Sequence, residues 1–165
     1  MTLLVEDYAP KLRDSEVERE LAAELRKLPE TERLQFIYKL MEVPHCFGVA
    51  MWLAKTCLKE RQSLEAILTQ GFERGDASTV KYWIEAVIHG LGFRRVVRLV
   101  SQRIATDPES VIKAEYSLRR WIPKDNPKDA DAFAALHQAV EQIMRNDPAI
   151  ERKVRPFKAL MNRSD

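Results

Sequence analysis

The feature that most constrains the fold of this chain is an apolar pattern that recurs about every 31 residues. Val49, Val80 and Val111 are 31 residues apart, and each lies in a segment with the apolar spacing of an amphipathic helix. A second, interleaved set of apolar positions shifts by 32 residues, from Leu64, Ile67, Leu68 and Phe72 to Val96, Leu99, Val100 and Ile104. One helix pair cannot bury its apolar stripe alone, whereas stacked pairs share a continuous core. The repeated period therefore predicts a stack of helix pairs.

Start and stop signals divide the chain into nine predicted helices. Prolines, glycines and capping residues stand between the apolar segments. The expected pairs cover residues 15–42, 44–74, 79–106 and 109–145, and a ninth helix at 149–162 caps the stack through Ile150, Val154, Phe157 and Leu160. The predicted fold class is all-α, in a single domain over 1–165, with an irregular segment at 1–14.

Capping residues give the predicted helix starts. Ser15 and Glu18 have the spacing of a capping box, and Ser63 precedes the helix expected at 64–74. Asp76 and Ser78 are candidate caps for the helix at 79–90, and Asp107-Pro108 opens the next one. The polar 123–131 segment is the longest connection, where additional residues are tolerated most easily.

The composition fits a cytoplasmic globular protein. Of 165 residues, 45% are hydrophobic and 32% are charged, which is typical of a folded, charge-rich domain. No basic-then-apolar leader opens the chain, and no apolar run approaches the roughly 20 residues that cross a membrane. Cys46 and Cys57 are eleven positions apart on one predicted helix, too far for a disulfide, so reduced thiols are expected.

The segment from Asp107 to Ala114, Asp-Pro-Glu-Ser-Val-Ile-Lys-Ala, resembles the first helix of a HEAT repeat, in which Val111, Ala114 and Leu118 have the family spacing. Asp76, Val80, Val87 and Gly90 give a looser version, whereas Trp52 and Trp83 depart from the family pattern. The resemblance implies a right-handed α-α superhelix of about four antiparallel pairs. It also implies a protein-binding scaffold, although some relatives bind nucleic acid or act as DNA glycosylases.

In HEAT-like stacks the second helix of each pair lines the concave side, and its solvent-facing residues form the groove. The expected partner-binding residues are Arg94, Arg95, Arg98, Gln102, Gln70, Tyr38, His137 and Gln138. The arginines are the most informative, since Arg94 and Arg98 share one helix face with Arg95 beside them. Residues 77–165 carry a net charge of +5, which favours a partner with an acidic surface.

Alternatives remain for these arginines and for the tryptophans. Together with Arg119 and Arg120, the arginines could form a solvated face that pairs with Glu85, Glu109 and Glu115, or they could bind a nucleic-acid backbone. Trp52 and Trp83 occupy one column of the repeat. They are expected to pack in the core, and the alternative is a stacking platform for bases.

The sequence contains no catalytic motif with the spacing of a known chemistry. No Gly-rich phosphate loop or nucleophile elbow is present, and the histidines and cysteines lack zinc-ligand spacing. The expected protein is therefore not an enzyme and needs no metal or cofactor. The leading hypothesis is a non-catalytic protein-binding scaffold. The alternative is a nucleic-acid-binding or DNA-repair protein that uses the basic groove around Arg94, Arg95 and Arg98.

Overall fold

The computed structural model describes residues 3–73 and 79–161, and every regular element in these ranges is helical. This confirms the predicted all-α fold class. The elements are α1 (Val5–Tyr8), η1 (Ala9–Lys11), α2 (Ser15–Leu25), α3 (Glu30–Met41), α4 (Phe47–Cys57), α5 (Arg61–Glu73), α6 (Val80–Leu91), α7 (Phe93–Ser101), α8 (Pro108–Leu118), η2 (Arg119–Trp121), α9 (Pro127–Asn146) and α10 (Pro148–Met161).

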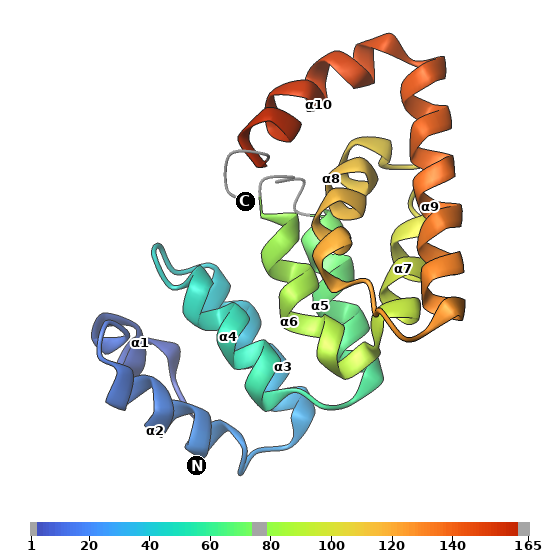
Figure 1. Cartoon of the computed structure of the whole chain (residues 1–165). Helices are drawn as coiled ribbons and strands as arrows, with labels where there is room; N and C mark the ends of the chain where they lie inside the picture. The colour runs from blue at the N-terminus through green and yellow to red at the C-terminus, as the bar shows by residue number, and fades with distance from the viewer. Residues whose placement is uncertain (1–2, 74–78, 162–165) are drawn as a thin grey trace.

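The helices alternate between two layers. One layer consists of α2, α4, α6, α8 and α10, and each of these helices contacts the next. In the other layer, α3 packs against α4, and both α7 and α9 pack against α8. The stack forms an arc from α2 and α4 to α9, with α10 returning across its end (Figure 1). Packing between helices that follow one another in the chain is compatible with a helical repeat.

The curvature places the two layers differently from the sequence-based expectation. In the view of Figure 1, α3, α7 and α9 lie on the outer side of the arc, and α4 and α8 lie on its inner side. The expectation that the second helices line the concave side is therefore wrong. Buried alanines provide the physical reason, because small side chains let helices approach closely: Ala50 and Ala54 in α4, Ala86 in α6 and Ala114 in α8.

Ion pairs between successive helix pairs repeat with a regular sequence spacing. Three of them join residues 30 positions apart: Lys55–Glu85, Glu65–Arg95 and Glu73–Arg103. The next two join residues 35 positions apart: Glu85–Arg120 and Arg94–Asp129. The Arg94–Asp129 pair extends into the polar 123–131 connection, whereas Glu85 and Arg120 both precede it.

Trp83 occupies the centre of the core. Its side chain is 2% exposed and packs edge-to-face on Phe47 of α4, with the ring centroids 5.4 Å apart. A Cβ added at Gly71 of α5 would lie 2.5 Å from Cγ of Trp83. Gly71 therefore permits the close approach of α5 to α6. The prediction that Trp83 is a core residue is confirmed.

Two of the predicted helix caps differ in the structure. The cap of α2 is Asp14, whose carboxylate accepts a hydrogen bond from Glu16 N at 2.8 Å, so the capping box at Ser15 is wrong. α5 begins at Arg61, which leaves Ser63 buried inside the helix and not at its cap. By contrast, Asp107 accepts from Ser110 N at 3.1 Å and caps α8 as predicted. Asp76 and Ser78 lie outside the described residues.

Two further helix boundaries and the N-terminal segment differ from the predictions. α4 begins at Phe47 and not at Pro44, since His45 adopts a left-handed φ of 68°. α7 ends at Ser101, five residues before its predicted end, and turns follow. Residues 3–14 are not wholly irregular, because α1 and η1 form there and bury Val5. In α10, Val154 is buried as expected, whereas Phe157 and Leu160 have side chains outside the described set.

Within the described ranges, no helix combines the length and the apolar character that a membrane-spanning segment requires.

Candidate functional site

Four arginine side chains line one surface hollow at the start of α5 and α7. The hollow has a volume of about 380 Å³, and Leu91, Gly92, Phe93 and Asp129 complete its walls. Arg61 is the first residue of α5. We call the hollow lined by Arg61, Arg94, Arg95 and Arg98 the arginine hollow. The structure brings together three of the expected binding residues, Arg94, Arg95 and Arg98. It adds Arg61, which the prediction missed because the helix was expected to begin at residue 64.

The start of α7 depends on Gly92. Its φ of 80° lies in the left-handed region, where a side chain is strained even though a Cβ would meet no atom within 4 Å. Gly92 is also the N-cap, and no side-chain hydrogen bond caps this helix. The first amides of α7 therefore bring the partial positive charge of a helix N-terminus to the wall of the hollow.

Two of the arginines are held in place by acids. Arg94 Nε donates to Asp129 Oδ1 at 2.8 Å, and Asn126 Nδ2 donates to Asp129 Oδ2 at 2.9 Å. Arg95 Nε donates to Glu65 Oε1 at 2.8 Å, and this hydrogen bond is the main cause of a raised pKa for the Arg95 guanidinium. These contacts fix the direction of both side chains.

The other two arginines, Arg61 and Arg98, are exposed and make no ion pair with any described side chain. The acids Asp129 and Glu65 compensate Arg94 and Arg95, so two positive charges remain beside the hollow. Guanidinium groups present planar donors that match carboxylate and phosphate oxygens. The arginine hollow is therefore suited to bind an anionic group.

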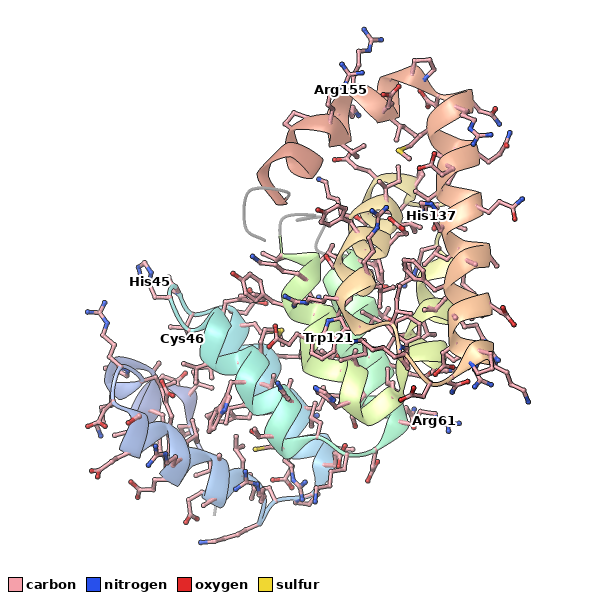
Figure 2. The ribbon with its side chains drawn as sticks, viewed as in Figure 1. His45, Cys46, Arg61, Trp121, His137 and Arg155 are labelled. Atoms are coloured by element: carbon pink, nitrogen blue, oxygen red, sulfur yellow. The ribbon has the colours of Figure 1, made fainter. Side chains whose placement is uncertain are left out.

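The remaining expected binding residues do not line this hollow. Tyr38 of α3 and Gln70 of α5 are half-buried, whereas Gln102 after α7 and Gln138 of α9 are exposed. Figure 2 shows Arg61 near the lower end of α5 and His137 well above it on α9. One continuous groove from Tyr38 to Gln138 is not formed by the described hollows.

His137 instead joins α9 to α8 through a buried carboxylate. Glu115 is 0% exposed, and its Oε1 lies 2.9 Å from His137 Nδ1. Arg119 donates to both Glu115 oxygens at 3.2 Å, and Phe133 stacks on the His137 ring. The expected pairing of arginines with these acids is confirmed in part, because Arg119 at the start of η2 pairs with Glu115 and Arg120 pairs with Glu85. Arg94 and Arg95 pair with other acids.

The two tryptophans of the repeat column do not form a platform beside Arg98. Trp83 is buried, and its Nε1 donates to Thr79 Oγ1 at 3.1 Å. Trp52 is half-buried and lines a separate hollow of about 250 Å³ with Tyr82 and Glu85. The stacking of bases between these rings is therefore not supported by their geometry.

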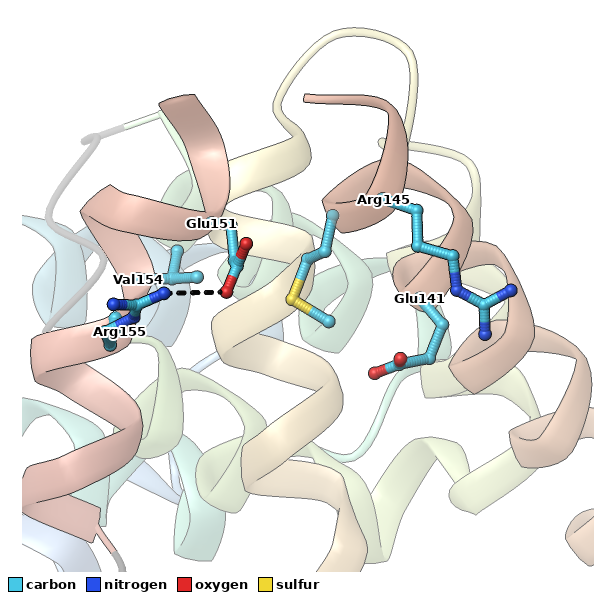
Figure 3. A pocket seen from close by; sticks show the side chains of 6 residues that line it. Glu141, Arg145, Glu151, Val154 and Arg155 are labelled. Carbon is cyan, nitrogen blue, oxygen red and sulfur yellow. Dashed lines mark hydrogen bonds and ion pairs between the residues drawn. The ribbon is translucent and has the colours of Figure 1, made fainter. Parts of the chain in front are cut away.

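The other hollows have compensated charges. Glu85 lies between Lys55 at 3.8 Å and Arg120 at 3.3 Å, and with Arg120 and Trp121 it lines a hollow of about 260 Å³. Figure 3 shows the hollow between α9 and α10, of about 340 Å³, where Arg155 pairs with Glu151 at 3.1 Å. Among the described hollows, the arginine hollow has the largest uncompensated charge.

Both cysteines are buried free thiols. Burial raises the pKa of the Cys46 thiol, so its thiolate forms at a more alkaline pH than in an unfolded chain. We expect alkylation of Cys46 at pH 8 to be at least tenfold slower in the folded protein than in urea. Because the pKa of this thiol is higher in the folded state, the unfolded chain loses the proton at a lower pH. The free energy of unfolding therefore decreases as the pH rises above the usual cysteine range. Mass spectrometry of iodoacetamide-treated samples measures the rate, and equal rates in both states would contradict burial of this thiol.

Comparison with protein-family models, curated proteins and solved structures gives no significant match for this chain. The fold places the chain among all-α proteins whose helices pack against helices that are close to them in the sequence.

Proposed function

We propose that this chain is a non-catalytic scaffold that binds an acidic segment of another protein at the arginine hollow. The observation that carries the proposal is the pair Arg61 and Arg98, which face one hollow without a described acidic partner. An acidic segment placed there would make charge-assisted hydrogen bonds with both guanidinium groups. The proposed setting is the cytoplasm, where the two free thiols stay reduced.

The resemblance of one segment to a HEAT repeat supports the same proposal. The Asp107-Pro108 start that resembles the family forms a capped helix, with Pro108 at its first position. Stacked helix pairs provide a rigid surface on which a few charged side chains keep their spacing. The proposed binding surface lies on α5, α7 and the start of α9, which are the second helices of their pairs.

Charge reversal at the hollow tests this proposal. The variant Arg61→Glu/Arg98→Glu should lose its acidic partner, with a decrease in affinity of at least tenfold, because two attractive contacts become repulsive. The matched control is Arg13→Glu/Arg19→Glu, which makes the same charge change at exposed positions near α2. Quantitative affinity capture identifies proteins lost only from the first variant, and titration of the purified partner measures the affinity.

Circular dichroism of both variants checks that the helices are intact. A partner that binds both variants equally would contradict the proposed site. The same variants test the nucleic-acid alternative, since salt-dependent binding of a DNA duplex that is lost only with Arg61→Glu/Arg98→Glu would favour a nucleic-acid-binding protein.

A further inference from the structure

We infer that the arginine hollow recognises a phosphorylated side chain, a phosphomonoester on the partner protein. This inference rests on the proposed function and names the chemical group that the partner would present. The inference is carried by four arginines that line one hollow, Arg61, Arg94, Arg95 and Arg98.

The charge of the hollow matches a phosphomonoester better than a carboxylate. Asp129 and Glu65 compensate Arg94 and Arg95, and the charges of Arg61 and Arg98 remain. A phosphorylated serine or threonine carries about −1.5 to −2 at pH 7 and has three acceptor oxygens. A carboxylate carries −1 and cannot engage both free arginines in bidentate contacts as well as a phosphate does.

The arginine and backbone N–H donors around the hollow suit a compact anion such as a phosphate group. Arg94 uses its Nε for Asp129, which leaves both terminal nitrogens available to a ligand. Arg98 lies one turn after Arg94 on the same face of α7. Gly92 has open space where a Cβ would stand, so an oxygen can also approach the amides at the start of α7. The volume of about 380 Å³ exceeds a phosphate group and leaves room for the side chain that bears it.

The surroundings favour an isolated phosphate over a nucleic-acid backbone. A nucleic-acid strand carries a negative charge about every 3.4 Å and needs a continuing basic track. Here exposed acids adjoin the hollow in sequence: Glu60 precedes Arg61, and Asp131 follows Asp129. Asp129 itself stands in the wall of the hollow. A single phosphoryl group avoids these acids, whereas a strand would pass over them.

Nuclear magnetic resonance titration tests the inference with defined probes. N-acetyl-phosphoserine methylamide is added to the ¹⁵N-labelled chain, and the signals of the Gly92–Arg95 amides and the arginine Nε–H groups are followed. N-acetyl-glutamate methylamide and a single-stranded oligonucleotide are compared at equal ionic strength. We expect saturable shifts with phosphoserine at an affinity at least tenfold above that for glutamate. Arg61→Ala and Arg98→Ala should each weaken phosphoserine binding about tenfold, while Arg13→Ala should not.

The outcomes separate this inference from the proposed function. Equal affinity for the glutamate and phosphoserine probes would overturn phosphate recognition and leave the acidic-segment proposal standing. Tighter binding of the oligonucleotide, with the same dependence on Arg61 and Arg98, would overturn both in favour of nucleic acid. If no probe shifts these signals and the charge-reversed chain captures the same partners, the hollow is not a binding site and both proposals fail.

Discussion

Replacing Trp83 by alanine is expected to lower the free energy of unfolding by about 3–5 kcal/mol. The indole is 2% exposed and fills the space between α4, α5 and α6, with Phe47 and Gly71 against its ring. Its removal leaves a cavity that the neighbouring helices cannot close without losing their own contacts. Urea denaturation followed by circular dichroism measures the loss. Trp52→Ala is the comparison, and it should cost less because that side chain is only half-buried.

A double-mutant cycle with Gly71→Ala sharpens this prediction. In the wild-type background Gly71→Ala should cost about 1–3 kcal/mol, because the new Cβ would lie 2.5 Å from Trp83 Cγ. In the Trp83→Ala background the methyl group meets a cavity, and the helix gains up to about 1 kcal/mol from alanine over glycine. The same cost in both backgrounds would show that the two helices do not approach through this contact.

Replacing Glu115 by alanine is expected to destabilise the protein by about 2–3 kcal/mol. The carboxylate is fully buried and accepts hydrogen bonds from Arg119, while His137 of α9 contacts the same group. Removing one member of a buried ion pair costs about 3–5 kcal/mol. The smaller value applies here because the side chains of Arg119 and His137 are 44% and 45% exposed, so water can solvate them.

Two variants of this site separate charge from shape. Glu115→Gln keeps a carbonyl acceptor and the side-chain volume, so we expect about half the loss seen with alanine. Glu109→Gln on the same helix removes a carboxylate that is 38% exposed and that pairs, among the described side chains, with Lys113 at 3.1 Å. It should change stability by less than about 0.5 kcal/mol. A loss of similar size for Glu109→Gln and Glu115→Ala would contradict the structural role of the buried carboxylate.

The helical architecture was predictable because burial imposes a period on the sequence. The apolar columns through Val80 and Val111 required helices that pack in order, and both residues are buried in α6 and α8. Proline and capping residues located several ends, as at Asp107-Pro108. The helix start at residue 15 is confirmed, but the capping role predicted for Ser15 is wrong because Asp14 offers the same chemistry one position earlier. Local sequence does not distinguish the two residues.

The candidate site was predictable only in part. The spacing of Arg94, Arg95 and Arg98 placed them on one face of α7, and they do line one hollow. Arg61 joins them from another helix, so its proximity depends on tertiary packing. The curvature of the stack depends on how closely the helices of each layer pack. The period of the apolar residues does not show which layer lies on the concave side, because the period is the same in both cases. For this reason the sequence predicts one groove for His137, Gln138 and the arginines, whereas His137 contacts Glu115 in the structure.

The regular spacing of the contacts between helix pairs has a consequence for how the chain folds. The contacts of Cys46 with Ala9, of Glu85 with Lys55 and Arg120, and of Arg94 with Asp129 join positions 30 to 37 residues apart in the sequence. Chains whose contacts are close in sequence close only short loops on the way to the native state, and they fold quickly. Each helix pair can therefore dock as soon as the pair before it is complete, so that assembly can follow the order of synthesis without waiting for the opposite end of the chain.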